Sequence, residues 1–449
     1  MQTSPKKCSF AQKQSEHQYN MYRNITHNLE NWKNSSNRKP LILLGARQVG
    51  KTWIMQDFGK RHYESVAYVN CDENPLAKTM FEEDYSIPRI LLVVQAITGV
   101  TVLPGKTLII FDEIQEAPRG LHCLKYFYEN AQEYHVMAAG SLLGVAIGHK
   151  ESFPVGKVNM LRLYPMNFEE FLLALGEKQL YEILQQGDKK ILGIMKPKYI
   201  NLLRQYYFVG GMPEVVLSYA ENKNLKEVRA LQKDIIESYR RDISKHATNS
   251  EAVRINQVLD SIPSQLTKEN KKFIYGVIKE GARAAQFELA IQWLIDAGIV
   301  YKVPRVSTLK LPLKAYEDLG AFKLFLLDCG LFGQMADAPA AQTIASNHAF
   351  TEYKGAFTEQ YVHQQLTSME INTYYWSNEK SSGEIDFVIQ SNGRVIPIEV
   401  KAEENVRSKS MSEYIKKYPE LQLKGLRISM KDFVDQGWME NIPLYAIKI

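Results

Sequence analysis

A chain of 449 residues is longer than one hydrophobic core usually supports, so its length predicts two to four domains. The net charge of +5 is compatible with nucleic acid as a partner but does not argue for it. The four cysteines form no C-x-x-C pair, which excludes a zinc ribbon or a disulfide framework and is typical of the cytoplasm. The longest apolar run, residues 90–100, is too short to span a bilayer, so we expect no membrane partner.

The first strongly patterned stretch predicts a phosphate-binding loop. Residues 1–20 are polar and aperiodic and predict a disordered tail, and residues 21–33 predict an amphipathic lead-in helix. Residues 41–44 predict a buried strand, and the spacing G-x-x-x-x-G-K-T then leads into a helical pattern, which is the context a P-loop requires. We expect Lys51 to reach the β- and γ-phosphates of ATP and Thr52 to hold Mg²⁺. The predicted nucleotide contacts are Gly45, Ala46, Arg47, Gln48, Val49, Gly50, Lys51 and Thr52.

A later strand, residues 107–112, ends in two carboxylates. In P-loop enzymes an Asp at this position binds Mg²⁺ and a following Glu can orient the attacking water, so we assign Asp112 to the metal and Glu113 to the water. Further strands are predicted at residues 66–70, 134–141 and 155–163, with helical patterns at 76–97 and near 126–128. Ser141 lies where related ATPases sense the γ-phosphate, although a Gly-Ser strand terminator explains it equally well. Residues 21–165 therefore predict an α/β P-loop core with a parallel sheet.

The middle of the chain is predicted to be helical. Residues 166–248 predict a lid region, interrupted by a tight turn at residues 210–214. Arg240 and Arg241 could serve a neighbouring subunit as an arginine finger in a homo-oligomer, but a solvated helix end is the more frequent role of such a pair. Residues 249–310 are typical of a winged helix. Because the helix that would read DNA has few basic residues, a packing or lid role is favoured over groove reading.

The C-terminal unit, residues 311–449, contains a second group of carboxylates. Two alternating strands flank Asn392-Gly393, which predicts a type I′ hairpin in which the numbers of paired residues sum to 785. Asp386 then faces Glu399, and Lys401 lies on the same face.

Two facing carboxylates repel each other, and a divalent cation such as Mg²⁺ or Mn²⁺ would remove that cost. Lys401 could then orient water or stabilise a developing charge. The alternative is an exposed charged face of a hairpin.

Several motifs together resemble the AAA-family ATPases (AAA_14) that are paired with a C-terminal DUF4143 domain. They are residues 44–52, the string Phe-Asp-Glu-Ile-Gln at 111–115, residues 163–171, and the turn at 210–214. The family looks like a relative of STAND-type ATPases, whose Gly-x-Pro turn touches the nucleotide, which implies contacts from Gly211 and Pro213. The DUF4143 part resembles PD-(D/E)XK nucleases. That resemblance implies a centre of Glu359, Asp386, Glu399 and Lys401, with metal on Asp386 and Glu399.

These features predict a cytoplasmic ATPase coupled to a metal-dependent nuclease that acts on DNA. The alternative function is a STAND-like switch, in which slow ATP turnover controls the binding of DNA or a protein partner and the C-terminal domain cleaves nothing.

Overall fold

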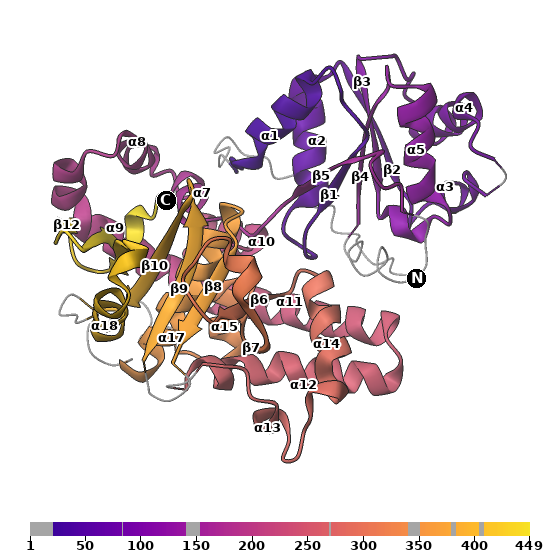
Figure 1. Cartoon of the computed structure of the whole chain (residues 1–449). Helices are drawn as coiled ribbons and strands as arrows, with labels where there is room; N and C mark the ends of the chain where they lie inside the picture. Colours follow the sequence, from indigo (N-terminus) through magenta and orange to yellow (C-terminus); the bar gives the residue numbers. More distant parts are fainter. Residues whose placement is uncertain are drawn as a thin grey trace, which may run out of the picture.

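The computed structural model describes residues 21–82, 84–140, 153–268, 271–339, 351–378, 383–403 and 408–449. The predicted tail at residues 1–20 and the predicted sensor Ser141 lie outside the described residues. The N-terminal part of the chain forms one α/β unit, drawn in indigo and purple in Figure 1, and the rest lies below it and to its left in this view, as helices around a second sheet.

The N-terminal unit is a parallel sheet of five strands with the order β2-β3-β4-β1-β5. This confirms the parallel α/β core expected from the alternation of strands and helices. The strands are β1 (Leu41–Leu44), β2 (Ser65–Asn70), β3 (Thr107–Asp112), β4 (His135–Ala139) and β5 (Asn159–Arg162). The helices are α1 (Ile25–Asn34), α2 (Lys51–His62), α3 (Pro75–Thr79), α4 (Ile87–Thr98) and α5 (Gly120–Asn130), with a short 3₁₀ turn at Ile114–Glu116.

Helices cover both faces of this sheet, with α1 and α2 on one side and α4 and α5 on the other (Figure 1). Leu41 and Leu43 join the core beneath α1 and α2, whereas Ile42 and Leu44 join the core beneath α4 and α5. A strand buried on both faces has no polar side, which is why residues 41–44 form an unbroken apolar run. The single helical stretch expected at 76–97 is divided between α3, which Asn74 caps, and α4, which begins at Ile87 with Pro88 in its first turn.

Helices follow the parallel sheet. They are α7 (Phe168–Ala174), α8 (Lys178–Gln186), α9 (Lys189–Val209), α10 (Pro213–Asn222), α11 (Leu225–His246), α12 (Asn249–Leu266), α13 (Tyr275–Ile278) and α14 (Ala284–Asp296). Asn167 and Thr248 each begin a helix with a reciprocal capping box, which satisfies backbone N–H groups that have no partner inside the helix. Helices α7 to α11 lie within residues 166–248, where the sequence predicted a helical lid region, and α12 to α14 lie within residues 249–310, where it predicted a winged helix.

The second sheet has eight strands in the order β12-β13-β11-β10-β9-β8-β6-β7. They are β6 (Val300–Val306), β7 (Glu317–Leu326), β8 (Thr373–Ser377), β9 (Glu384–Ser391), β10 (Arg394–Lys401), β11 (Gly425–Ser429), β12 (Val434–Asp435) and β13 (Met439–Pro443). The accompanying helices are α15 (Cys329–Met335), α17 (Thr351–Ser368) and α18 (Lys409–Lys417), with 3₁₀ turns at Leu313–Tyr316, Pro419–Leu421 and Leu444–Ala446. Because β6 pairs antiparallel with β7, this sheet continues across residue 310.

The register of the β9–β10 hairpin is the one expected from its turn. Ser391 pairs with Arg394, and Phe387 pairs with Ile398, so the paired numbers sum to 785. Asn392 and Gly393 both have positive φ, at 48° and 72°, as a type I′ turn requires. The prediction of this register is confirmed, and Asp386 and Glu399 are the next residues outward from the paired segment.

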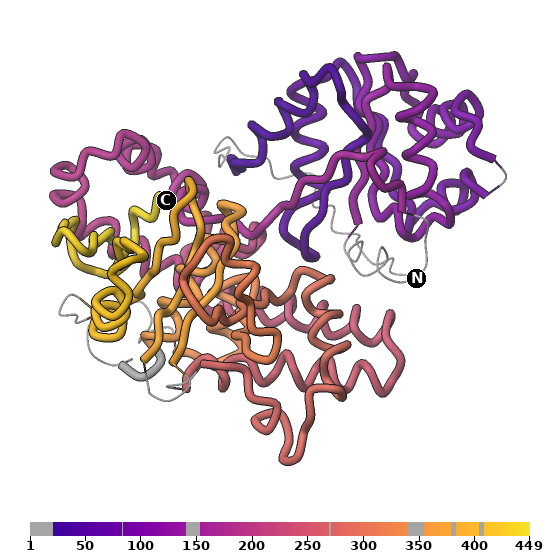
Figure 2. Tube along the Cα trace, viewed as in Figure 1, coloured from indigo at the N-terminus to yellow at the C-terminus, as the bar shows by residue number. Residues whose placement is uncertain are grey.

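The C-terminus returns to the helical region, where the yellow end of the tube in Figure 2 lies beside α8 and α9. Tyr445 stacks on Tyr199 with ring centroids 4.8 Å apart, and Lys448 donates a hydrogen bond to the carbonyl of Leu184 at 2.9 Å. These contacts bring the last residues of the chain into the same core as α9. Within the described ranges, no helix combines the length and the apolar character that crossing a membrane demands.

Candidate functional site

The P-loop lies between β1 and α2, as the motif predicted. Gly45 has φ 149°, and a Cβ at that position would stand 2.4 Å from the carbonyl oxygen of Leu163. Gly50 has φ 95° and immediately precedes the first residue of α2. The positive end of the α2 dipole therefore faces the loop, which suits an anionic ligand.

Lys51 is held inside the loop that it serves. Its side chain is buried, and Nζ donates to the carbonyl oxygens of Gly45 and Ala46 at 2.8 Å each. Burial lowers the pKa of Lys51 to about 8, and the nearby carboxylates Glu113 and Asp112 only partly offset this effect. A phosphate group would give this ammonium a strong partner, so the site is prepared for an anion.

The predicted magnesium ligands lie side by side. The Thr52 hydroxyl donates to Oδ2 of Asp112 at 2.6 Å, and the Tyr68 hydroxyl donates to the same oxygen at 3.0 Å. A hydroxyl and a carboxylate in contact at the mouth of a P-loop are the oxygen donors that Mg²⁺ prefers, so these residues fit the ion. Tyr68 was not expected from the sequence, because its place at this edge follows from the pairing of β2 with β3.

Glu113, the carboxylate assigned to the attacking water, accepts a hydrogen bond from Gln115. Glu113 has φ 49°, a left-handed conformation that is uncommon for a residue with a side chain. Gln115 Nε2 donates to Glu113 Oε2 at 2.6 Å. Gln115 also lies against the end of β4, where a Cβ at Gly140 would stand 1.8 Å from its Oε1. The Gln of the Phe-Asp-Glu-Ile-Gln string therefore links Glu113 to the neighbouring strand.

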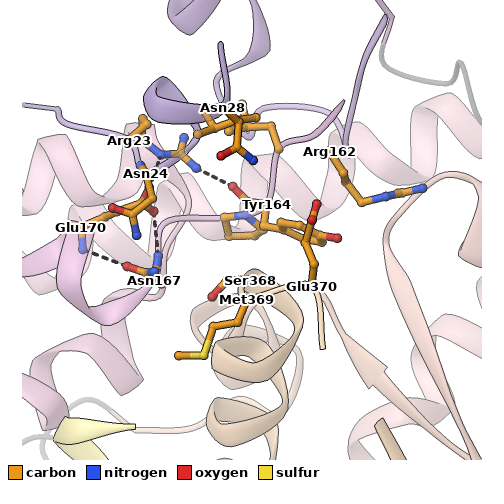
Figure 3. A pocket seen from close by; sticks show the side chains of 13 residues that line it. Arg23, Asn24, Asn28, Arg162, Tyr164, Asn167, Glu170, Ser368, Met369 and Glu370 are labelled. Carbon is orange, nitrogen blue, oxygen red and sulfur yellow. Dashed lines mark hydrogen bonds and ion pairs between the residues drawn. The ribbon is translucent and has the colours of Figure 1, made fainter. Parts of the chain in front are cut away.

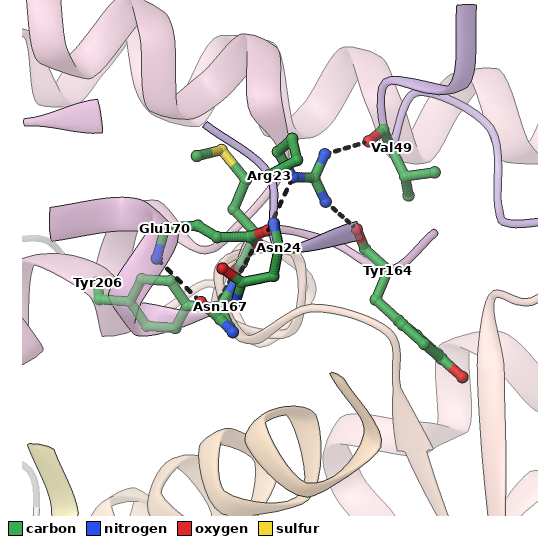
Figure 4. Close-up of polar contacts among 8 residues, drawn as sticks. Arg23, Asn24, Val49, Tyr164, Asn167, Glu170 and Tyr206 are labelled. Carbon is green, nitrogen blue, oxygen red and sulfur yellow. Dashed lines mark hydrogen bonds and ion pairs between the residues drawn. The ribbon is translucent and has the colours of Figure 1, made fainter. Parts of the chain in front are cut away.

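Arg23 connects the P-loop to the helical region through its hydrogen bonds and an ion pair (Figure 4). It is buried, and it donates to the carbonyl oxygens of Val49 at 2.9 Å and Tyr164 at 2.6 Å. It also pairs with Glu170 of α7 at 3.2 Å. No pattern in the sequence marked Arg23, because its partners are 26, 141 and 147 residues away.

A cavity of about 210 Å³ adjoins this arginine (Figure 3). Its walls come from the segment before α1, the end of β5 and the end of α17. Arg162 and Tyr164 line it from the parallel sheet, and Met369 and Glu370 line it from the C-terminal unit. The N-terminal and C-terminal units therefore meet beside Arg23, which contacts the P-loop.

Residues from the middle of the chain cover the P-loop. Arg47 forms an ion pair with Asp242 of α11 at 2.5 Å, and the Tyr239 hydroxyl donates to the carbonyl of Arg47 at 3.1 Å. A Cβ at Gly298, in the turn between α14 and β6, would lie 3.3 Å from the backbone nitrogen of Ala46. Neither Asp242 nor Gly298 was identified from the sequence.

The other predicted residues of the middle region lie in different environments. Pro213 borders the P-loop, since its ring would be 3.5 Å from a Cβ at Gly50. Gly211 packs against the chain instead: its N–H donates to Asp328 at 2.6 Å, and a Cβ there would stand 2.0 Å from the carbonyl of Met166. Arg240 is bound to Asp260 of α12 at 2.7 Å, and Arg241 is exposed.

The second group of predicted residues also comes together in the fold. Glu359 from α17, Asp386 from β9, and Glu399 and Lys401 from β10 form one cluster, referred to below as the carboxylate centre. Lys401 Nζ lies 2.6 Å from Glu399 Oε1, and the backbone N–H of Val400 donates to Asp386 at 2.7 Å. Burial, followed by repulsion from Glu359 and Glu399, raises the pKa of Asp386 to about 8.

Two lysines that the sequence did not identify also reach this centre. Lys271, from the segment between α12 and α13, forms an ion pair with Glu359. Lys323 of β7 is completely buried, lies 3.7 Å from Glu359 and pairs with Glu384. A lone lysine within the apolar run of residues 321–327 was a signal that could have revealed Lys323, because an unpaired charge is not stable in such a strand.

The donor atoms of the centre suit a hard divalent cation. Oxygen Oε2 of Glu399 and oxygen Oε2 of Glu359 are buried without a hydrogen-bond partner. Within the part of the chain that the structure describes, no three His, Cys, Asp or Glu side chains are arranged to hold a metal ion. Asp386 and Glu399 fit as ligands, while Glu359 is engaged by the two lysines.

Comparison with known families divides the chain into three parts. Residues 37–172 match an AAA domain family (AAA_14). This part of the chain is therefore similar to AAA domains, and the geometry of its P-loop agrees with that similarity. Residues 200–342 match a domain of unknown function (DUF8612), and residues 354–447 match another domain of unknown function (DUF4143).

Two solved structures are distantly similar to the chain. A Walker-type ATPase of Pyrococcus abyssi is 14% identical, with 69% of this chain and 94% of that chain covered and a TM-score of 0.42. The ORC1 protein of Aeropyrum pernix, in complex with DNA, is 14% identical, with 72% and 93% covered and a TM-score of 0.29. No protein with a curated description matches the sequence.

Proposed function

We propose that the chain hydrolyses ATP at its AAA-type domain and couples this to a metal-dependent DNA nuclease centre in its C-terminal unit. The observation that carries the proposal is the meeting of Glu359, Asp386, Glu399 and Lys401 from three separate elements in one cluster, in which Glu359 and Glu399 are buried and Asp386 and Lys401 are half-buried. A hairpin with a merely solvated charged face would not bury these groups against a helix that contributes a third carboxylate.

In the proposed ATP hydrolysis, each of the groups at the P-loop has one role. Lys51 would bind the β- and γ-phosphates, and Thr52 with Asp112 would hold Mg²⁺, which would neutralise charge on the phosphates. Glu113, oriented by Gln115, accepts a proton from the attacking water. Pro213 borders the loop at Gly50, which is consistent with the nucleotide contact that the resemblance implied for it.

The proposed nuclease centre requires one divalent metal ion and the ammonium group of one lysine. Mg²⁺ or Mn²⁺ on Asp386 and Glu399 would supply Lewis-acid polarisation of a phosphodiester. Lys401, 2.6 Å from Glu399, is placed to orient water and to stabilise negative charge as the bond breaks.

A second candidate function is a STAND-like switch whose C-terminal unit binds DNA or a protein without cleaving it. The observation that favours it is the cover over the P-loop, where Asp242, Tyr239 and Gly298 contact the loop directly. In this function, nucleotide binding would displace part of this cover and so move the middle of the chain.

One experiment separates the two functions. Purified protein is incubated with linear, nicked and branched DNA, with Mg²⁺ or Mn²⁺, and with or without ATP. Asp386→Asn and Lys401→Met should abolish cleavage, while Asp435→Asn, an exposed carboxylate on β12, should not. Absence of cleavage under every condition, with DNA still bound, would favour the switch.

A companion experiment tests the ATPase half. Lys51→Ala should eliminate ATP binding, and Glu113→Gln should retain binding while hydrolysis falls at least about a hundredfold, the usual worth of a general base. Tight ATP binding by Lys51→Ala would contradict the assignment of the P-loop.

A further inference from the structure

The carboxylate centre already contains a cation from outside its own domain. Lys271 belongs to the segment between α12 and α13, and its ammonium pairs with Oε1 of Glu359. The lysine side chain is 17% exposed and that of Glu359 is 4% exposed. The attraction therefore acts largely away from water, where it is strong.

A second lysine neutralises the other side of the same carboxylate. Lys323 Nζ lies 3.7 Å from Oε2 of Glu359, pairs with Glu384, and stands 4.9 Å from the ring centroid of Tyr375. Its side chain has no exposed surface. Lys323 is part of the sheet, so it cannot leave without disrupting β7.

Lys271 differs from Lys323 in its access to water, because its side chain is 17% exposed whereas that of Lys323 has no exposed surface. The segment of Lys271 is joined to the sheet by the N–H of Phe273, which donates to the carbonyl of Phe322 at 2.8 Å. The helical unit that carries this segment also contacts the P-loop, through Asp242 of α11 and Gly298 after α14. The segment that carries Lys271 thus belongs to the same helical unit that contacts the P-loop.

We propose that Lys271 is a removable counter-cation that competes with a divalent metal ion for Glu359. While Lys271 is in place, Glu359 is unavailable and only Asp386 and Glu399 can act as ligands. When Lys271 withdraws, all three carboxylates can contribute. This inference rests on the proposed metal site.

Charge counting supports such an exchange. Three lysines, Lys271, Lys323 and Lys401, face four carboxylates, which are Glu359, Glu384, Asp386 and Glu399. With every group ionised the formal charge is −1, and a divalent ion added to this set would change it to +1. The same ion added after Lys271 has left gives zero, so a buried metal and a buried Lys271 disfavour each other.

The test measures Mn²⁺ binding by the full chain without nucleotide, with free Mn²⁺ followed by electron paramagnetic resonance. Each variant is compared with its Asp386→Asn counterpart, so that only binding at the carboxylate centre is counted. Lys271→Ala should bind Mn²⁺ at this centre at least about tenfold more tightly than the natural sequence, the scale of one nearby charge at low effective dielectric. Mn²⁺ should also raise the unfolding temperature of Lys271→Ala by more than that of the natural protein.

Matched variants make the result specific. Lys271→Arg, which keeps the charge, and Lys272→Ala, which removes the adjacent one, should show no gain. If Lys271→Ala does not fold, Lys271→Gln takes its place, because its amide still donates to Glu359. Equal affinity in Lys271→Ala and the natural protein, with both sensitive to Asp386→Asn, would overturn the competition and leave the metal site standing. Absence of Asp386-sensitive binding in every variant would overturn the metal site itself and the competition with it.

Discussion

Affinity for ATP should fall as pH rises from 7 to 9, because Lys51 must be charged to bind phosphate. Burial lowers the pKa of this lysine to about 8 in the nucleotide-free protein. Phosphate oxygens favour the charged form and raise the pKa again, so binding takes up a proton wherever the free lysine is neutral. With a free pKa of about 8 the dissociation constant should rise about tenfold between pH 7 and pH 9, equivalent to about 1.4 kcal/mol.

Isothermal titration calorimetry in buffers of different ionisation enthalpy measures both quantities. Proton uptake on ATP binding should be about one half per site at pH 8 and about nine tenths at pH 9. Lys60→Ala, which removes an exposed lysine from the same helix, should leave the dependence intact. A dissociation constant that is constant across this range, with no proton uptake, would show that Lys51 is charged before the nucleotide arrives and would refute the reasoning.

Three further substitutions test contacts at the P-loop and in the helical region next to it. Gly211→Ala should lower the free energy of unfolding by about 3 kcal/mol or more, because its Cβ would meet a backbone oxygen at 2.0 Å. The control is Gly193→Ala in the open interior of α9, which should raise the free energy of unfolding by about 0.5–1 kcal/mol. Urea unfolding measures both changes. Equal effects of the two would contradict the packing described. Arg23→Met should lower the free energy of unfolding by about 3–5 kcal/mol in the same assay, because it leaves the carboxylate of Glu170 buried without its ion-pair partner. A loss below about 1 kcal/mol would contradict the importance of the Arg23–Glu170 ion pair for stability. Asp242→Asn should tighten ATP binding about fivefold, or about 1 kcal/mol by calorimetry, because it removes a negative charge near the phosphate site, and weaker binding would show that this ion pair helps to form the site.

Features that depend on neighbouring residues were predictable from the sequence. The P-loop needed only a strand, two glycines and a helix start within 12 residues, and each of these is present. The β9–β10 register followed from a two-residue turn in which Asn392 and Gly393 both adopt positive φ. In both cases the backbone conformation is decided by a few adjacent side chains, so reading the chain in order is sufficient.

The surroundings of these motifs were not predictable in the same way. Arg23, Asp242 and Gly298 reach the P-loop from positions far away in the chain, and each looks like an ordinary helix or turn residue in its local sequence. Which of the many charged residues meets which partner depends on how the helices pack over the sheet.

The sequence by itself therefore determined the two motifs to which catalysis is assigned by proposal, namely the P-loop with Asp112 and Glu113 and the hairpin that carries Asp386 and Glu399. Only the tertiary structure decided which cations neutralise the buried carboxylates. Lys271 and Lys323 come from different elements, and they meet Glu359 because α12, β7 and α17 pack together. The physical reason is that a buried charge must find an opposite charge in space, and packing, not sequence order, supplies it.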